Sequence, residues 1–332
     1  MRETLHNKCS LYADNYLKLR QAFKWEYAEN NRLGALLYTM EDRPVDVAGI
    51  KGCRELIKAN TGIFSQFKDV TNFMVSVMLS LKAEPDIKIR DAIRIYDALK
   101  EEGFHSSAYL VLAAVSIAFY SEPEQYRGAV ARAKGFYDAM KAEHRFITSA
   151  DDYTFAALLA LSDKEVNPAI REIEDSYLWL KEEFRSSNAV WSLSQVLSFS
   201  GEDTQAKGKR VVDLYQALKV RGRKFGLYTE LPFLGIVSLL AREMNTVADE
   251  IVEVDNYLKD IKGFGNWSIT AKERLMFAAA LVCDDFLADV KKGTVEVALS
   301  NTTAALLLAQ QAATIAATSA IITTTAASSS ST

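Results

Sequence analysis

The stretch Ile95-Tyr96-Asp97-Ala98-Leu99-Lys100, followed by Phe104, contains the pattern that decides the fold. Its last step, an apolar residue followed directly by a basic one, recurs along the chain at intervals of 38 to 43 residues. The pairs are Leu19-Arg20, Ile57-Lys58, Leu99-Lys100, Met140-Lys141, Leu180-Lys181, Leu218-Lys219 and Ile261-Lys262. A period of about forty residues is typical of helical repeat proteins, in which each repeat is one supersecondary unit.

Aromatic residues keep phase with these basic markers. A tyrosine lies four residues before the marker in five units, whereas Arg54 and Leu258 occupy that position in the second and seventh. A phenylalanine follows every marker: Phe23, Phe64, Phe104, Phe146, Phe184, Phe225 and Phe264. Because residues three and four apart share one face of a helix, the pattern predicts an amphipathic leading helix that ends near each marker.

A second apolar run follows each phenylalanine, for example over 110–117, 158–161 and 234–240, and predicts a following helix in every unit. Prolines 44, 85, 123 and 168 suit the first turn of a leading helix. Ser149 and Asp152 have the spacing of a capping box. We therefore expect an all-α fold of about seven helical hairpins that stack into an α-solenoid or, if the curvature closes, an αα-toroid.

The C-terminal end of the chain differs in composition from the repeats. Residues 297–332 carry no charge and are rich in Ala, Thr, Leu and Ile. We expect residues 1–293 to form a single helical-hairpin repeat domain and residues 294–332 to form an Ala/Thr-rich helix with a disordered Ser-rich end. Because Gln310 and Gln311 interrupt the apolar run, a membrane span is disfavoured. The predicted helix, 297–325, would lie against the repeats or mediate self-association with a second copy.

Composition excludes several classes of protein. Lys and Arg total 39 against 43 Asp and Glu, so the net charge of -4 disfavours nucleic acid as a partner. Cys9, Cys53 and Cys283 are far apart and show no CxxC spacing, so neither a disulfide framework nor a zinc cluster is indicated. Residues 1–15 lack the apolar core of a signal peptide. We expect a cytoplasmic protein with free thiols, no structural metal and no cofactor.

Three stretches resemble a known family. They are Arg54-Glu-Leu-Ile-Lys-Ala-Asn-Thr-Gly-Ile-Phe64, Tyr96-Asp-Ala-Leu-Lys-Glu-Glu-Gly-Phe104 and His144-Arg-Phe-Ile-Thr-Ser-Ala-Asp-Asp-Tyr153. They look like the uncharacterised bacterial family called domain of unknown function 4003, and the similarity runs through the whole chain. The resemblance implies no activity, because that family carries none that could be transferred.

Two acidic groups are candidate catalytic residues. His144, Asp151 and Asp152 place an imidazole and carboxylates in one interhelix loop, as a general base or metal site requires. Asp284, Asp285 and Asp289 resemble the DDxxxD pattern with which helical isoprenoid enzymes hold magnesium. For the first group, helix capping is the favoured explanation. For the second, the favoured explanation is a solvated helix face, because short motifs are often false positives.

A basic segment contains the candidate anion-binding residues, which are Lys207, Lys209, Arg210, Arg221, Arg223 and Lys224. Clustered cations are what phosphate recognition requires. Cations near the end of a helix also complement its dipole, and we favour that interpretation. The four tryptophans, Trp25, Trp179, Trp191 and Trp267, are predicted to pack in the core rather than to line a ligand cage.

The sequence does not state a biochemical function. The interpretation that it favours is a non-catalytic helical-repeat scaffold whose concave face binds a protein, a peptide or a small ligand. One alternative is an enzyme that uses the acidic residues in the cavity of an αα-toroid, which requires those residues to converge. A second alternative is phosphate or nucleic-acid binding through the basic segment.

Overall fold

The protein is all-helical. A computed structural model describes residues 1–291 except 64, 70, 229 and 241, with side chains as far as Phe286. The described residues form fourteen α-helices and three short 3-10 segments, and they contain no strand. The α-helices are α1 (Glu3–Ala22), α2 (Ala28–Met40), α3 (Val47–Asn60), α4 (Asn72–Ser80), α5 (Pro85–Glu101), α6 (Ala108–Tyr120), α7 (Tyr126–Glu143), α8 (Tyr153–Leu161), α9 (Val166–Leu180), α10 (Ser187–Leu197), α11 (Thr204–Val220), α12 (Leu231–Ser238), α13 (Met244–Lys259) and α14 (Ala271–Lys291).

The odd-numbered helices are the predicted leading helices, and each ends within three residues of its basic marker. Glycine in the left-handed conformation stops two of them: Gly103 after α5 has φ +89° and Gly222 after α11 has φ +72°. The next amide then bonds back into the helix, from Phe104 N to Leu99 O at 3.2 Å and from Arg223 N to Leu218 O at 2.9 Å. This is the Schellman geometry, which satisfies carbonyls that the helix end leaves open.

The leading and following helices differ in how their apolar residues are arranged. In α5 the buried residues Ile89, Ala92, Ile95 and Leu99 lie on one stripe, and all the lysines and arginines of the helix lie outside it. The following helices α4, α6, α8, α10 and α12 contain no charged residue. A helix that is apolar all round has to be buried on all sides, whereas an amphipathic helix needs cover on one side only. The following helices therefore form the interior of the protein.

Local capping follows the sequence predictions. The backbone N–H of Ser149 donates to Asp152 Oδ2 at 2.9 Å, which confirms the capping box ahead of α8. Ser107 caps α6 by accepting from the Leu110 amide at 3.2 Å. Pro85 is the first residue of α5, where its missing N–H costs nothing. These caps fix where the apolar helices begin.

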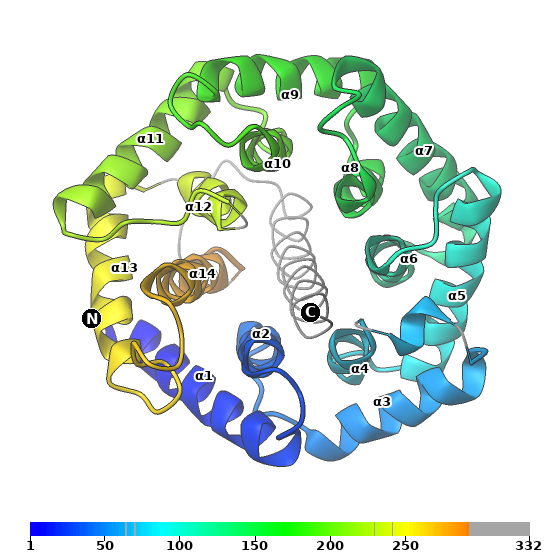
Figure 1. The fold of residues 1–332 in the computed structure, drawn as a ribbon, viewed down its shortest axis with the longest axis horizontal. Coiled ribbons are helices and arrows are strands. Elements are labelled where there is room, and N and C mark those ends of the chain that lie inside the picture. The colour runs from blue at the N-terminus through cyan, green and yellow to red at the C-terminus, as the bar shows by residue number, and fades with distance from the viewer. Residues whose placement is uncertain (64, 70, 229, 241, 292–332) are drawn as a thin grey trace, which may run out of the picture. The chain divides into compact units, whose positions relative to one another are not determined.

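The described chain divides into two compact units. Of the described residues, unit 2 comprises Asp14–Asn167, and unit 1 comprises Met1–Ala13 together with residues 168–291. In unit 2, α3, α5 and α7 form one layer, and α4, α6 and α8 lie along one side of it (Figure 1). Unit 1 has the same construction, with α11 packed on α13 and with α10, α12 and α14 in contact in sequence order. The predicted domain boundary at residue 293 and the predicted tail helix lie outside the described residues.

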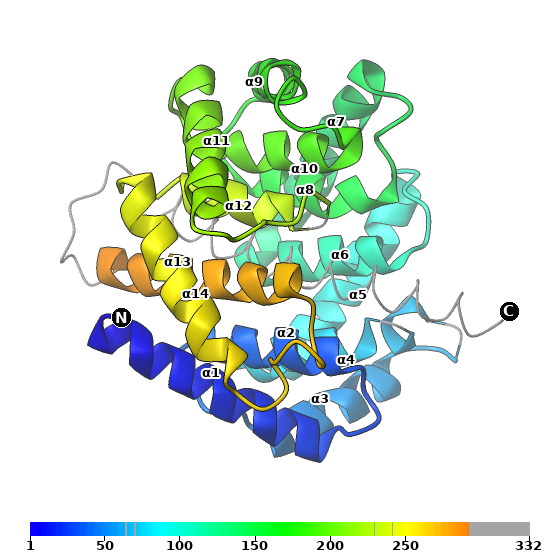
Figure 2. The same cartoon turned by 60° about the vertical axis from the view of Figure 1, so that its left-hand side comes forward.

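The N-terminal residues of unit 1 pack against its last helical pair. The ring of Tyr12 lies 5.2 Å from that of Phe264 and 5.8 Å from that of Phe277, measured between centroids. Figures 1 and 2 both show the beginning of α1 beside α13 and α14. More than two hundred and fifty residues separate these partners in sequence, and no local pattern predicts their contact.

Most predicted core positions are buried, but several aromatic residues are not. Trp191 is buried, as predicted, whereas Trp25 and Trp267 are almost fully exposed, so the core prediction is wrong for those two. Phe146 is also exposed, and Tyr215 is only half-buried. Trp25, Phe146 and Trp267 lie in turns after leading helices, where no neighbouring helix face covers them. The sequence predicted burial of the two tryptophans from their type of side chain, and of Phe146 from its phase with the markers, without showing that the chain had already left the helix.

Candidate functional sites

The loop that holds His144, Asp151 and Asp152 connects α7 to α8. The backbone of His144 ends α7, and its carbonyl accepts the amide of Thr148 at 3.0 Å. Asp152 is buried and caps the next helix through the Ser149 amide, while the Ser149 hydroxyl donates to Asp151. Capping thus accounts for the position of both carboxylates.

Aromatic rings cover the inner side of this loop. Tyr153 packs edge-on against Tyr137 at 4.9 Å and Phe104 at 4.8 Å between ring centroids. The hydroxyl of Tyr153 accepts the backbone N–H of His105 at 3.3 Å. Burial raises the pKa of both Tyr137 and Tyr153, and the nearby carboxylates of Asp151 and Asp152 raise that of Tyr137 further. Both phenols therefore stay protonated at neutral pH and act as hydrogen-bonding core residues.

The second acidic group lies on α14 in unit 1, so the structure does not bring the two acidic groups into one unit. Asp284 and Asp285 are buried, which contradicts the solvated helix face favoured from the sequence. The ammonium of Lys8 lies 2.5 Å from Asp284 Oδ2, and the guanidinium of Arg2 lies 2.7 Å from Asp285 Oδ2. Buried carboxylates need paired cations, and the N-terminal segment supplies them. The side chain of Asp289 lies outside the described residues.

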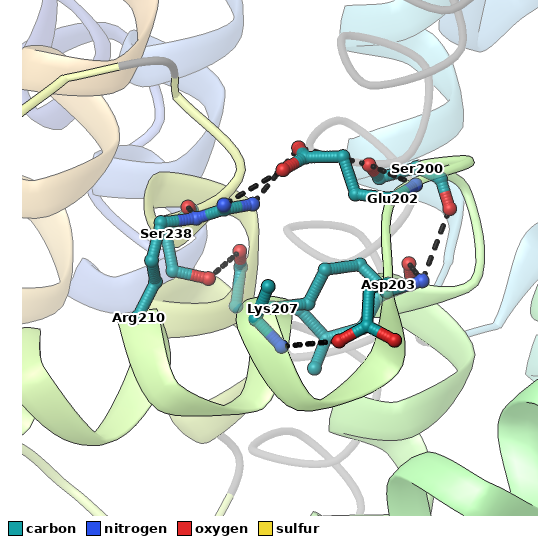
Figure 3. Close-up of polar contacts among 9 residues, drawn as sticks. Ser200, Glu202, Asp203, Lys207, Arg210 and Ser238 are labelled. Carbon is teal, nitrogen blue, oxygen red and sulfur yellow. Dashed lines mark hydrogen bonds and ion pairs between the residues drawn. The ribbon is translucent and has the colours of Figure 1, made fainter.

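Lys207 and Arg210 begin the basic segment on α11, and each has partners within unit 1. Lys207 is fully buried, forms an ion pair with Glu172 and donates to the carbonyls of Leu197 and Ser200, both at 3.0 Å. Arg210 makes a bidentate pair with Glu202, at 2.7 and 2.9 Å (Figure 3). Those hydrogen bonds from Arg210 hold the pKa of Glu202 below its ordinary value. Fork-to-fork pairing of this kind is strong and directional.

Three of the other four candidate cations also pair with carboxylates. Lys209 pairs with Asp213 at 2.5 Å, Arg221 with Asp249 at 2.7 Å and Arg223 with Asp255 at 2.7 Å. Lys224 is exposed, and the described residues offer no carboxylate within ion-pair distance of it. An anion would have to displace an existing carboxylate at each of the paired positions.

Cationic side chains of three leading helices donate hydrogen bonds to backbone carbonyls near the ends of the following helices. Arg210 Nε donates to the carbonyl of Ser238, the last residue of α12, at 2.9 Å. In the same way Arg132 of α7 donates to Ala160 O at 3.0 Å near the end of α8, and Lys88 of α5 donates to Ala118 O at 2.6 Å near the end of α6. The last carbonyls of a helix have no intrahelical donor, and these following helices carry no cation of their own. This signal was present in the sequence, because Arg132 and Arg210 both lie nine residues before a marker.

A surface groove of about 590 Å³ lies between α11 and α13 in unit 1. Its charged lining includes Arg210, Arg221, Arg242, Asp213 and Glu243. All three arginines already bind carboxylates, including Arg242, which lies 2.5 Å from Glu250 Oε2. The groove is therefore lined by ion pairs, and no nucleophile with a neighbouring base occurs in its lining.

The cysteines and the remaining ligating residues give no metal site in the described part of the chain. Cys9, Cys53 and Cys283 are all free and buried. Burial raises the pKa of the Cys9 thiol to about 12 and that of Cys53 to about 11, so both thiols are protonated at neutral pH. Among the described residues, no three His, Cys, Asp or Glu side chains are grouped so that they could hold a metal ion.

The fold and its ion pairs define an all-helical protein in which the buried side chains of Lys8, Lys207, Asp255 and Asp284 are ion-paired. The chain belongs to the family described as protein of unknown function DUF4003, whose model matches residues 15–312, in agreement with the resemblance seen in the sequence. It is also 24% identical over 204 residues to the uncharacterized protein YeaA of Bacillus subtilis (strain 168). That match covers 60% of this chain and 62% of the relative. No solved structure matches the chain.

The helices were also compared with what a membrane span requires. In the part of the chain that the structure describes, no helix combines the length and the apolar character needed to cross a bilayer. The function of this family and of the B. subtilis relative is unknown, so the comparisons assign no activity to any residue.

Proposed function

We propose that this protein is a non-catalytic helical-repeat scaffold whose hairpins continue through both units as one array and whose following helices bind a partner on the concave side. The regular phase of the basic markers supports one array. The packing of Tyr12 on Phe264 and Phe277 favours the closed form, an αα-toroid, over an open solenoid. The buried thiols suit a reducing compartment, and we propose the cytoplasm.

The observation that carries this proposal is the apolar character of α4, α6, α8 and α12 on every side. All residues of α8 from Tyr153 to Ala160 are buried, and α8 contacts α7 on one side and α6 on another. A helix that is apolar around its whole circumference also needs cover on the side that faces away from the leading helices. That side, repeated along α4, α6 and α8 in unit 2 and along α10 and α12 in unit 1, is the proposed binding face.

Because the helices of this face contain no charged residue, an uncharged, apolar partner would bind it best. A charged peptide would have to bury its charge against helices that contain no charged residue, which costs several kcal/mol for each unpaired ion. Residues 297–332 of the chain carry no charge. We propose that this segment is the resident occupant of the face, and that a peptide or protein partner binds by replacing it.

A truncation tests this proposal. A chain that ends at Gly293 should bind the dye 8-anilinonaphthalene-1-sulfonate and should associate in size-exclusion chromatography, because the binding face has lost its cover. A synthetic peptide of residues 297–325 added in trans should bind the truncated chain and reverse both effects. In the full chain, Ile315→Lys should mimic the truncation, whereas Ser328→Lys should not.

The proposed occupant is wrong if the truncated chain remains monomeric and does not bind the dye. The binding face itself is wrong if neither the peptide nor any other uncharged helical peptide binds the truncated chain.

A further inference from the structure

Two turns of unit 1 expose large apolar side chains that the core does not use. Val220, the last residue of α11, is 85% exposed, and Tyr228 in the turn that follows is 68% exposed. The turn after α13 carries Trp267, which has an exposed fraction of 104% and so projects fully from the surface. Exposed apolar side chains grouped on one surface generally mark an interaction site.

Lysines surround these side chains. Lys219, Lys224, Lys259 and Lys262 are exposed, and no described carboxylate lies within ion-pair distance of any of them. The two turns contain fewer acidic residues than lysines. Asp260 is exposed, whereas Glu230 is half-buried and accepts the Tyr228 amide at 3.4 Å. The two turns together therefore carry an excess of positive charge.

A chain of hydrogen bonds through α13 links the two turns of unit 1. Helix α11 packs on α13, and Arg221, directly after α11, pairs with Asp249 in the first half of α13. The buried carboxylate of Asp255 joins the turns by accepting from Arg223 at 2.7 Å and from Arg274 at 2.8 Å. Arg274 also donates to Phe264 O at 3.2 Å and to Asn266 Oδ1 at 2.9 Å.

Both turns contain a glycine in the left-handed conformation. Gly222 (φ +72°) stops α11, whereas Gly263 (φ +93°) lies four residues beyond Lys259, the last residue of α13.

We propose that the described residues of 219–230, which exclude 229, and of 259–270, here called the turn surface, dock unit 1 on an anionic phospholipid bilayer. A projecting tryptophan with a neighbouring aliphatic side chain suits the interfacial region of a bilayer, where the indole has an apolar environment and its N–H stays hydrated. The lysines reach the headgroup layer on their flexible stems and meet its negative charge. Docking of this kind is peripheral and is independent of the binding face on the following helices.

Three features favour a bilayer over other partners. The apolar side chains project instead of lining a groove, so they need a deformable surface and not a complementary pocket. Val220 is aliphatic and cannot stack on a base, which disfavours single-stranded nucleic acid. Two turns of unit 2 likewise pair an exposed aromatic side chain with a neighbouring cation. Trp25 is 92% exposed, and the ammonium of Lys24 lies 5.3 Å from its indole centroid. Phe146 is exposed and follows Arg145 in the sequence.

Vesicle flotation with the full chain tests the proposal. Vesicles that contain 30–40% phosphatidylglycerol should carry the protein to the top of the gradient, whereas pure phosphatidylcholine vesicles should not, and added salt should weaken the binding. Lys224→Gln/Lys262→Gln should lower the partition coefficient roughly tenfold or more. Trp267→Ala/Tyr228→Ala should lower it by about the same factor, and vesicle addition should shift Trp267 fluorescence to the blue.

Controls separate this surface from general effects. Lys209→Gln, at an exposed lysine of the same unit, and Leu178→Ala, at an exposed leucine, should bind vesicles as the unaltered chain does. All variants should keep the same thermal unfolding midpoint, because the altered side chains are exposed. The proposal is overturned if the full chain does not float with anionic vesicles, or if the turn-surface variants float as well as the controls. Retention on RNA or heparin without vesicle binding would assign the surface to nucleic acid instead.

Discussion

Asp255 and Asp249 lie on the same helix, α13, and both bind arginine, but only Asp255 is buried. The side chain of Asp255 is 2% exposed and serves Arg223 and Arg274 together. The side chain of Asp249 is 65% exposed and serves Arg221, whose hydrogen bonds lower the pKa of that carboxyl. The two residues therefore separate the effect of burial from that of pairing.

We expect Asp255→Ala to lower the free energy of unfolding by about 3 to 5 kcal/mol, because it leaves the buried Arg274 without its carboxylate. Asp249→Ala should cost much less, because solvent and salt screen that exposed pair. Urea titration followed by circular dichroism measures both. Equal costs for the two variants would show that Asp255 does not join the turns as described.

At the scale of the element, the leading helices depend on one buried stripe. Leu99 of α5 lies on this stripe and is 1% exposed. Leu178 of α9 lies outside the buried stripe of its own helix and is 43% exposed. Leu99→Ala should lower the free energy of unfolding by about 2 to 5 kcal/mol, because it removes buried apolar surface and leaves a cavity. Leu178→Ala should change it by less than about 0.5 kcal/mol. An unchanged unfolding midpoint for Leu99→Ala would refute the helix phase derived from the basic markers.

At the scale of the whole molecule, the N-terminal segment is part of unit 1 and not a separate arm. Lys8 is buried against Asp284, and their atoms are 2.5 Å apart. Lys8→Met should lower the free energy of unfolding by about 3 to 5 kcal/mol, because Asp284 keeps a buried charge without this cation. The double variant Lys8→Met/Asp284→Leu should recover most of that loss, since it removes both charges. If the double variant is as unstable as the single one, the ion pair is not the reason for the loss.

The candidate sites were only partly predictable from the sequence. Ser149 and Asp152 were identified as a capping box because the interaction is local, spanning three residues. The burial of Asp284 and Asp285 was missed because their cations come from residues 2 and 8, far away in sequence. The pairing of Arg223 with Asp255, and hence the turn surface, depends in the same way on two helices meeting.

The sequence by itself determined the helices of this protein, because helix-forming information is local: the stripe of apolar residues, the basic marker and the glycine or capping residue all act within a few turns. Tertiary structure alone decided which charges are buried, which aromatic residues project and which distant segments pair. Trp191 and Trp267 show the difference, since both were predicted to pack in the core, yet one is buried and the other fully exposed. Burial depends on what the rest of the chain brings to a side chain, and no spacing within one hairpin contains that information.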